Sequence, residues 1–359
     1  MSAAARRPSV TTVRARLAGL VADRAGRRER GAVVVFALDG VGRALAARAW
    51  RTAAVSVLDS VFPTVSSAAW LSSLTGKPVA EHGIPGVVCT VDGRPANIYH
   101  HRQPLVAQPP DNVFSDAAAR GIRPVAVLCD LAQYPCSWRD LLLTHAETVE
   151  GTPLFTTPGP YAPPSLDRVE ADLRAAVAAG LSGGKRALVW CFVEIDTHLH
   201  HHGEDEYAVA AVRMIERIAT DLVADGHVVA AHSDHGHTPT THDPELARLL
   251  DGLADEYGFA MGGAGRTRWL YPRPGTAEAL AERLRKELPA DIGVEDADQV
   301  FPPGSPARAR VGDLFLVAAG EKFLAPAGYR YEHGSRTAAE VEVPFAVWGG
   351  EPDGGGTGR

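Results

Sequence analysis

The 359-residue sequence has few cysteines and no excess of basic residues. Its four cysteines are too few and too scattered for a disulfide framework or a CxxC metal knuckle: Cys89, Cys129, Cys136 and Cys191. Two of them lie in apolar runs, which predicts reduced, buried thiols. With 36 basic and 43 acidic residues the net charge is -7, which argues against a general nucleic-acid binder.

The sequence also lacks long hydrophobic runs. No stretch approaches the ~18 consecutive apolar residues of a membrane-spanning helix. The paired arginines near the N-terminus are not followed by the apolar segment of a secretory signal. We therefore expect no membrane association, no nucleic-acid polymer as a partner, and a cytoplasmic location.

Short apolar runs alternate with helical patterns from residue 31 onward. The runs at 31–38, 123–128, 186–193 and 227–231 are almost continuously hydrophobic, which is typical of parallel strands covered by helices on both faces. Helical spacing of apolar residues marks 166–179 and 205–224. This alternation predicts a doubly wound, mostly parallel α/β fold.

The domain organisation follows from changes in this pattern. Residues 240–330 are weakly patterned and rich in Gly and Pro, so we interpret them as an inserted cap or lid. Segments 78–122 and 153–164 are expected to be surface excursions. The expected divisions are an N-terminal basic helical segment at 1–30, an α/β catalytic core at 31–239, the cap at 240–330, and a return to the core with a C-terminal tail at 331–359.

Three of the apolar runs end in a carboxylate. Asp39 follows the first, Asp196 follows the third, and Asp234 follows the fourth. In an open parallel sheet, ligands bind beyond the carboxyl ends of the strands. One such Asp alone could equally be a helix N-cap, but three are hard to explain as caps. Two of the three have close histidines, His200 and His235.

Asp and His are ligands that suit zinc and manganese. Two neighbouring divalent ions can clamp the attacking and leaving oxygens of an in-line phosphoryl displacement. Hydroxyl residues crowd the start of a helix expected at about 66–75, where free N–H groups favour a phosphate. Ser66 and Thr64 are both candidate nucleophiles, and either could instead be an N-cap. His333, in a Gly-flanked turn, is a further candidate ligand.

Taken together, these blocks resemble the alkaline phosphatase superfamily and, within it, the nucleotide pyrophosphatase/phosphodiesterase branch. The resembling blocks, which occur in the family's order, are LDG (38–40), VFPTVSSAAWLSSLTGKPVAEHGIPG (61–86), EIDTHLHHHG (194–203), SDHGH (233–237) and EHGSRTAAEVEVPF (332–345).

The resemblance implies a set of site residues. One divalent ion would be held by Asp39, Asp234, His235 and the oxygen of Ser66. The other would be held by Asp196, His200 and His333. It also implies that Ser66 is the nucleophile, through a covalent phosphoserine. From the ligand types, we expect the two ions to be zinc or, second, manganese.

The sequence departs from the family pattern beside the nucleophile. The nucleotide pyrophosphatase branch has Phe-Pro-Asn after the nucleophile, whereas Ser67, Ala68 and Ala69 stand here. The Cys-x-Pro-x-Arg segment of sulfatases is missing, which argues against sulfate ester hydrolysis. The histidine run leaves one ligand open among His198, His200, His201 and His202, and the four-residue spacing from Asp196 favours His200. His237 and His242 could shape the pocket, but we interpret them as solvated loop residues. Three arginines could contact the phosphate or the leaving group, but we interpret them as exposed, solvated side chains: Arg266, Arg268 and Arg330.

The expected activity is therefore a two-metal phosphoester hydrolase, with a phosphodiester or pyrophosphate of a small nucleotide-like molecule as substrate. The alternatives are a phosphomonoesterase or phosphonate hydrolase of the same superfamily, a phosphomutase, and an inactive metal-binding homologue. The residues from 77 to 185 are too few for a mutase's second domain. The sequence does not determine the oligomeric state.

Overall fold

A computed structural model describes residues 7–26, 31–155, 163–183 and 186–350. Its larger sheet has seven strands in the order β2-β17-β8-β1-β7-β5-β6. All pairs are parallel except those of β17, which runs antiparallel to β2 and β8. The strands are β1 (Val33–Asp39), β2 (Ala54–Asp59), β5 (Arg123–Val127), β6 (Glu147–Val149), β7 (Ala187–Glu194), β8 (Val228–Ser233) and β17 (Glu342–Trp348).

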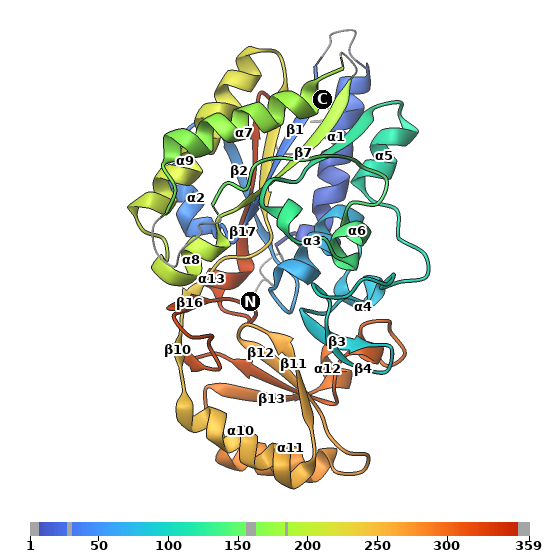
Figure 1. The fold of residues 1–359 in the computed structure, drawn as a ribbon, viewed down its shortest axis with the longest axis vertical. Helices are drawn as coiled ribbons and strands as arrows, with labels where there is room; N and C mark the ends of the chain where they lie inside the picture. The colour runs from blue at the N-terminus through green and yellow to red at the C-terminus, as the bar shows by residue number, and fades with distance from the viewer. Residues whose placement is uncertain (1–6, 27–30, 156–162, 184–185, 351–359) are drawn as a thin grey trace, which may run out of the picture.

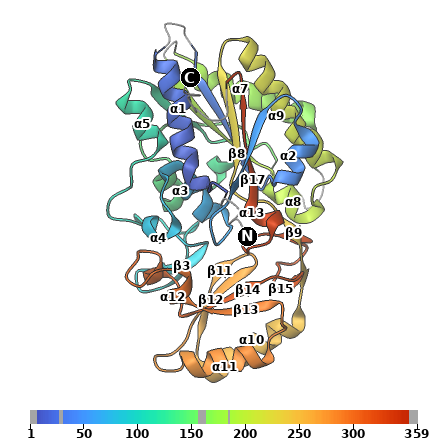
Figure 2. The same ribbon diagram turned by 180° about the vertical axis from the view of Figure 1, so that it is seen from behind.

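Helices cover both faces of this sheet, as Figures 1 and 2 show from opposite sides. On β1, Val33 and Val35 enter one apolar core while Val34 and Phe36 enter the other. Because both faces are buried, the strand has no polar alternation. One face carries α1 (Val13–Gly26), α3 (Ser66–Thr75), α5 (Val113–Ala119) and α6 (Ser137–Leu142); the other carries α2 (Arg43–Ala49), α7 (Leu166–Leu181) and α9 (Glu206–Ala224).

The predicted doubly wound α/β fold is thus confirmed. Each of the four hydrophobic runs forms a strand within a residue or two of its expected bounds, and α3, α7 and α9 occupy the expected helical stretches. All four cysteines are free and buried, which confirms the expectation made for the two in apolar runs. Among the described residues, no helix is both long and apolar enough to cross a membrane.

A second, antiparallel sheet lies below the first in Figure 1. Its order is β13-β14-β12-β11-β3-β4, and α10 (Pro244–Tyr257) and α11 (Ala277–Glu287) pack on it through leucines. The strands are β3 (Val88–Val91), β4 (Arg94–Asn97), β11 (Ala260–Ala264), β12 (Thr267–Tyr271), β13 (Ile292–Asp296) and β14 (Leu314–Ala318).

Two segments differ from the expected surface excursions. The hairpin β3–β4, from the stretch 78–122, joins β11 through Val88 and Gly263, and Cys89 and Ile98 are buried. Four-residue strands give little local signal, and their partner is far away in sequence. In 153–164, Leu154 and Phe155 are buried, whereas 156–162 lie outside the described residues. The division of the chain at 240 and 330 stays a prediction, as does the separation of 1–30, of which 1–6 and 27–30 lie outside the described residues.

Short elements connect these layers. They are η1 (Val10–Thr12), α4 (Val79–His82), η2 (Cys129–Gln133), α8 (Asp196–His202), β9 (Thr238–Pro239), β10 (Thr241–His242), α12 (Ala297–Val300), η3 (Arg308–Arg310), β15 (Lys322–Phe323), β16 (Tyr331–Glu332) and α13 (Ala338–Val341).

Candidate active site

The three strand-end carboxylates lie side by side at one edge of the larger sheet. Asp39 is the last residue of β1, Asp196 begins α8 shortly after β7, and Asp234 directly follows β8. Because β1 lies between β7 and β8 in parallel register, all three carboxylates emerge at the same edge. Asp39 and Asp234 are buried.

One ligand group forms around Asp39, Asp234 and His235, whose candidate ligand atoms all lie within 4.8 Å of one another. His235 Nε2 is 3.2 Å from Asp234 Oδ2 and 3.7 Å from Asp39 Oδ1. Ser66 Oγ donates to Asp39 Oδ1 over 3.2 Å and lies 3.1 Å from His235 Nε2. A serine oxygen therefore belongs to the same small cluster as two carboxylates and an imidazole.

A second group surrounds Asp196. His200 Nε2 is 3.1 Å from Asp196 Oδ2, and His333 Nε2 is 3.8 Å from Asp196 Oδ1. His200 lies four residues after Asp196 on α8, so both side chains share one face of the helix. Glu332 lies beside both histidines, with its Oε1 3.6 Å from His200 Nδ1 and 3.6 Å from His333 Nε2.

The other histidines of the run point elsewhere. His198 Nε2 lies 3.0 Å from Asp205 Oδ1, and the His202 ring stacks on His198 with centroids 4.6 Å apart. His201 Nδ1 donates to the carbonyl of Gly328. Of the four histidines, only His200 approaches Asp196 within the described structure.

The expectation that His237 is a solvated loop residue is wrong. The side chain is buried, and its Nε2 lies 2.8 Å from Asp196 Oδ1. The turn after β8 folds back onto Gly40, whose φ of +83° and missing side chain leave room for the ring. A Cβ at Gly40 would lie 2.8 Å from the imidazole. His242, by contrast, is exposed and donates to the carbonyl of Ala325.

The four clustered imidazoles share one orientation. Each directs Nδ1 at a backbone carbonyl: His200 at Tyr331, His235 at Gly236, His237 at Gly40 and His333 at Thr64. Since a carbonyl only accepts, Nδ1–H donates in each case, and the Nε2 lone pair faces the carboxylates in the neutral ring. Because the His237 proton is on Nδ1, no hydrogen lies between its Nε2 and Asp196 Oδ1 over their 2.8 Å contact. Both atoms, like Asp234 Oδ2, are therefore buried without a hydrogen-bond partner among the described residues. These donor atoms fit divalent cations.

Burial and neighbouring charges shift the pKa values of the clustered carboxyl and imidazole groups. Burial, together with Asp234 and Asp196, raises the pKa of Asp39 well above its usual value. Burial raises the pKa of Asp234 to about 7, and burial beside His333 lowers the pKa of His235. Burial would also lower the pKa of His200, but Asp196 and Glu332 outweigh it and raise that pKa to about 9. Several buried acids at one point require positive charge between them.

Ser66 and Thr64 have different surroundings. Ser66 is the first residue of α3, and the N-cap, Val65, gives that helix no side-chain cap. Thr64 is fully buried: its Oγ1 donates to the Ser335 carbonyl over 2.8 Å and accepts from the Gly334 N–H over 2.9 Å. Thr64 thus supports the turn that carries His333, whereas Ser66 faces the carboxylates.

Two supporting residues are missed by motif reasoning. Trp70 Nε1–H donates to Asp39 Oδ2 over 3.1 Å, and the four-residue spacing from Ser66 on α3 is the signal that could have found it. Trp138 Nε1–H donates to the carbonyl of Ser67 over 2.9 Å, which fixes the start of α3. No local sequence pattern connects Trp138 to this site.

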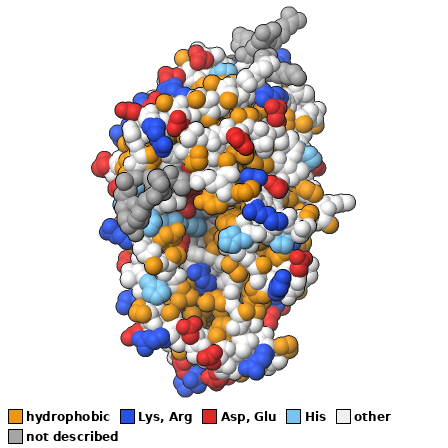
Figure 3. Space-filling model, viewed as in Figure 1, with side chains coloured by type: hydrophobic (Ala, Val, Ile, Leu, Met, Phe, Trp, Pro, Cys, Tyr) orange, Lys and Arg blue, Asp and Glu red, His pale blue; other side chains and the backbone are white. Residues whose placement is uncertain are grey.

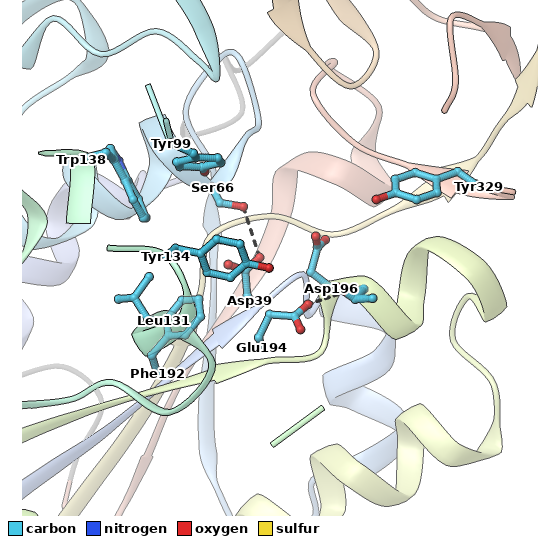
Figure 4. Close-up of a pocket in the computed structure, with 11 residues that line it drawn as sticks. Asp39, Ser66, Tyr99, Leu131, Tyr134, Trp138, Phe192, Glu194, Asp196 and Tyr329 are labelled. Carbon is cyan, nitrogen blue, oxygen red and sulfur yellow. Dashed lines mark hydrogen bonds between the residues drawn. The ribbon is translucent and has the colours of Figure 1, made fainter. Parts of the chain in front are cut away.

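A cavity of about 260 Å³ opens beside Ser66 (Figure 4). Tyr99, Trp138, Tyr134, Leu131 and Phe192 form one side of it, with Tyr329 opposite and Glu194 and Asp196 between them. In the space-filling view, histidine and hydrophobic side chains gather near the middle of this face (Figure 3).

The three arginines noted in the sequence lie outside the cavity lining. Arg266 is buried and paired with Glu340, and Arg268 donates to the carbonyls of Gly265 and Thr267. The interpretation of Arg266 and Arg268 as solvated surface side chains is therefore wrong. Arg330 is exposed, as expected.

Comparisons with known proteins identify the family. Residues 33–337 match the family model described as type I phosphodiesterase / nucleotide pyrophosphatase. Among curated proteins there is no match.

Solved structures with similar folds include phosphonoacetate hydrolase from Sinorhizobium meliloti 1021 in complex with phosphonoformate. It has a TM-score of 0.65 and 19% identity over 89% of this chain and 90% of that chain. Murine ectonucleotide pyrophosphatase / phosphodiesterase 5 has a TM-score of 0.61 and 14% identity over 88% of this chain and 87% of that chain. At sequence identities this low, the similarity to these two proteins shows a shared fold and no more.

Proposed function

The chain belongs to the type I phosphodiesterase / nucleotide pyrophosphatase family, and from this membership we propose that it is a metal-dependent phosphoester hydrolase with Ser66 as its nucleophile. The observation that carries the proposal is the position of Ser66 Oγ, 3.2 Å from Asp39 and 3.1 Å from His235. A hydroxyl at a helix start, beside buried carboxylates and imidazoles, suits phosphoryl transfer.

Two divalent ions are proposed, with zinc as the first choice and manganese as the second. Asp39, Asp234, His235 and Ser66 would hold one, and Asp196, His200 and His333 the other; His237 offers a further nitrogen to the second. Bound there, the ions would supply Lewis acidity and charge neutralisation for the phosphoryl group.

The proposed reaction has two successive displacements at phosphorus. In the first, Ser66 Oγ loses its proton and bonds to phosphorus as the P–O bond to the leaving alcohol breaks, and the alcohol oxygen takes up one proton. In the second, a water oxygen loses a proton and bonds to phosphorus, the Oγ–P bond breaks, and Ser66 Oγ takes up one proton. Trp70 orients Asp39 throughout, and Thr64 orients His333.

A phosphodiester is the proposed substrate, ahead of a phosphomonoester or a phosphonate. Among the described residues that line the cavity there is no Lys or Arg, but there are two acidic residues beside Ser66, Glu194 and Asp196. A second negative charge on the leaving group, as in a pyrophosphate or a carboxylate-bearing phosphonate, would meet no counter-charge from these side chains. Phosphonate hydrolysis remains the second candidate because of the likeness in fold to phosphonoacetate hydrolase.

The test compares parent and Ser66→Ala proteins, each loaded with zinc or manganese, on bis-p-nitrophenyl phosphate, p-nitrophenyl phosphate and phosphonoacetate. The parent should hydrolyse the diester fastest, and Ser66→Ala should lose several orders of magnitude while keeping its fold. Elemental analysis should find close to two ions per chain in the parent, and strong chelation should abolish turnover.

Acid-quenched parent enzyme given labelled substrate should carry phosphate on Ser66. Label on Thr64, or Ser66→Ala turnover near the parental rate, would remove the nucleophile assignment. Full activity after chelation would contradict metal dependence. Release of an isomerised phosphoester in place of phosphate would indicate a mutase, and no turnover with bound metal would indicate an inactive homologue.

A further inference from the structure

Residues 328–333, called the strap below, connect β15 to α13 and pack along α8. The Arg330 N–H donates to the carbonyl of His200 over 2.8 Å, and His201 Nδ1 donates to the carbonyl of Gly328 over 3.0 Å. At the end of α8, Gly203 leaves room for the Tyr331 ring, with which a Cβ at this position would clash. The strap and α8 are therefore closely packed against each other.

The strap holds His200 at three points. The His200 carbonyl accepts the Arg330 N–H, and its Nδ1–H donates to the Tyr331 carbonyl over 2.9 Å. The Tyr329 ring stacks on the imidazole, with centroids 4.0 Å apart and an interplanar angle of 24°. A stack covers a ring face and leaves the ring nitrogens free, so His200 Nε2 still faces Asp196 Oδ2 at 3.1 Å. These contacts together oppose rotation of the imidazole away from Asp196.

Tyr329 also belongs to the wall of the cavity beside Ser66. Figure 4 shows it on the opposite side of the cavity from Tyr134, with Asp196 between the two. Tyr329 is therefore in contact with a candidate ion ligand and also lines the space in which substrate would bind.

The stack should be stronger when His200 binds an ion. An imidazole bound to a divalent cation takes on part of the positive charge, and the face of an aromatic ring attracts positive charge. The Tyr329 ring should therefore stabilise the ion-bound form of His200 more than the ion-free form. The contact uses the ring and does not need the hydroxyl.

Resting on the proposed function, which places a second ion at Asp196, His200 and His333, we propose that Tyr329 is a positioning residue for this ion. Its ring fixes His200 in the orientation that binds the ion. The bound ion in turn holds Tyr329 in the cavity wall, because a coupling between two sites is reciprocal. Occupancy of the second ion site and the shape of the cavity thus depend on one side chain.

The test measures zinc affinity by competition with a chromophoric chelator in the parent, Tyr329→Leu and Tyr329→Phe. Leucine keeps apolar bulk at this partly buried position without an aromatic face, whereas phenylalanine keeps the ring. Tyr329→Leu should bind one of the two ions about tenfold more weakly, as expected when a group that orients a ligand is lost, and the other with parental affinity. Tyr329→Phe should bind both ions like the parent.

Tyr134→Leu is the matched control, because Tyr134 lines the same cavity from the opposite side. It should keep both parental ion affinities. A kinetic readout uses bis-p-nitrophenyl phosphate: in Tyr329→Leu the zinc concentration for half-maximal turnover should rise about tenfold, and excess zinc should restore kcat. A purely structural role of Tyr329 would not give a loss that one ion shows and added zinc reverses.

The outcomes separate this inference from the proposed function. Parental affinity for both ions in Tyr329→Leu, or equal weakening of both, would overturn the positioning role and leave the hydrolase intact. The same loss in Tyr329→Phe or in Tyr134→Leu would overturn it as well. If the parent binds two ions and hydrolyses none of the test esters, the proposed function fails, while the ion affinities still decide the role of Tyr329. A parent that binds no divalent ion would overturn both.

Discussion

Thr64 and Ser66 are two residues apart, yet their hydroxyls contact different parts of the molecule. Thr64, a candidate nucleophile or N-cap by sequence, instead hydrogen-bonds through Oγ1 to the turn at Gly334 and Ser335, about 270 residues later in the chain. Its backbone carbonyl also accepts the Nδ1–H of His333. Thr64 is therefore a positioning residue for a candidate ligand.

Replacing Thr64 with the isosteric valine should expose this role. Thr64→Val leaves the Ser335 carbonyl and the Gly334 N–H buried without partners, which should cost about 1–3 kcal/mol of unfolding free energy for each group. Urea denaturation measures the loss. Divalent-ion content after dialysis should also fall, since His333 loses support for its turn.

Thr64→Ser keeps the hydroxyl and is the matched control. It should retain the ion content of the parent and lose less stability than Thr64→Val. Equal ion content and stability in Thr64→Val and the parent would contradict a positioning role.

Trp70 offers a second test at this scale. Trp70→Phe keeps an aromatic ring on α3 and removes the N–H that donates to Asp39 Oδ2. Ion affinity at the Asp39 group should fall by about 10–100-fold, the usual effect of losing a hydrogen bond that orients a ligand. Competition with a chromophoric chelator measures it. Trp138→Phe, which affects Ser67 instead of Asp39, should change the ion affinity less.

A buried histidine on α4, His82, joins that helix to α3, which begins at the candidate nucleophile. His82 Nε2 lies 3.0 Å from Ser72 Oγ, and His82 Nδ1 accepts the Ile84 N–H over 3.2 Å. Nδ1 is an acceptor here, so the ring is neutral with its proton on Nε2. Burial lowers the pKa of His82 to about 3.

This arrangement predicts a loss of stability in mild acid. The unfolded His82 takes up a proton below its ordinary pKa of about 6.5, while the folded one stays neutral down to about 3. The unfolded state therefore binds more protons in this window, and stability falls as the pH drops from 6.5. At pH 5 the contribution of His82 should be about 2 kcal/mol.

Urea denaturation of the chelated protein at pH 7 and pH 5 measures this effect. His82→Gln should show a smaller difference between the two pH values than the parent. His242→Gln, at an exposed histidine, should keep the parental difference. If His82→Gln keeps the parental difference too, the buried neutral ring is not a source of the acid sensitivity.

For the molecule as a whole, the turn after β16 connects the two sheets. The Arg266 N–H donates to the His333 carbonyl, and Thr267 Oγ1 donates to the Gly334 carbonyl. Arg266 Nε lies 3.3 Å from Glu340 Oε1, which also accepts the Ser335 N–H. Both side chains of this ion pair are buried. The position of His333 therefore depends on both sheets.

Removing one member of this pair should destabilise the whole protein. Arg266→Met leaves Glu340 as a buried, uncompensated charge and should cost about 3–5 kcal/mol of unfolding free energy. In the double variant Arg266→Met, Glu340→Gln, part of that loss should be recovered, and a double-mutant cycle measures the coupling. Additive effects would mean that the two side chains do not depend on each other.

The sequence by itself determined the parallel core and the strand-end carboxylates, because hydrophobic runs report burial on both faces and parallel strands end at a common edge. It also indicated His200, because helical spacing is local. Only the tertiary structure decided which distant groups join them. His237 is buried by a turn that folds onto Gly40, His333 is held by Thr64, and the β3–β4 hairpin joins strands more than 160 residues later in the chain. The same is true of Tyr99, Trp138 and Glu194, which line one cavity from three separate segments. Contacts of this kind arise from packing between elements, and no local period in the sequence encodes them.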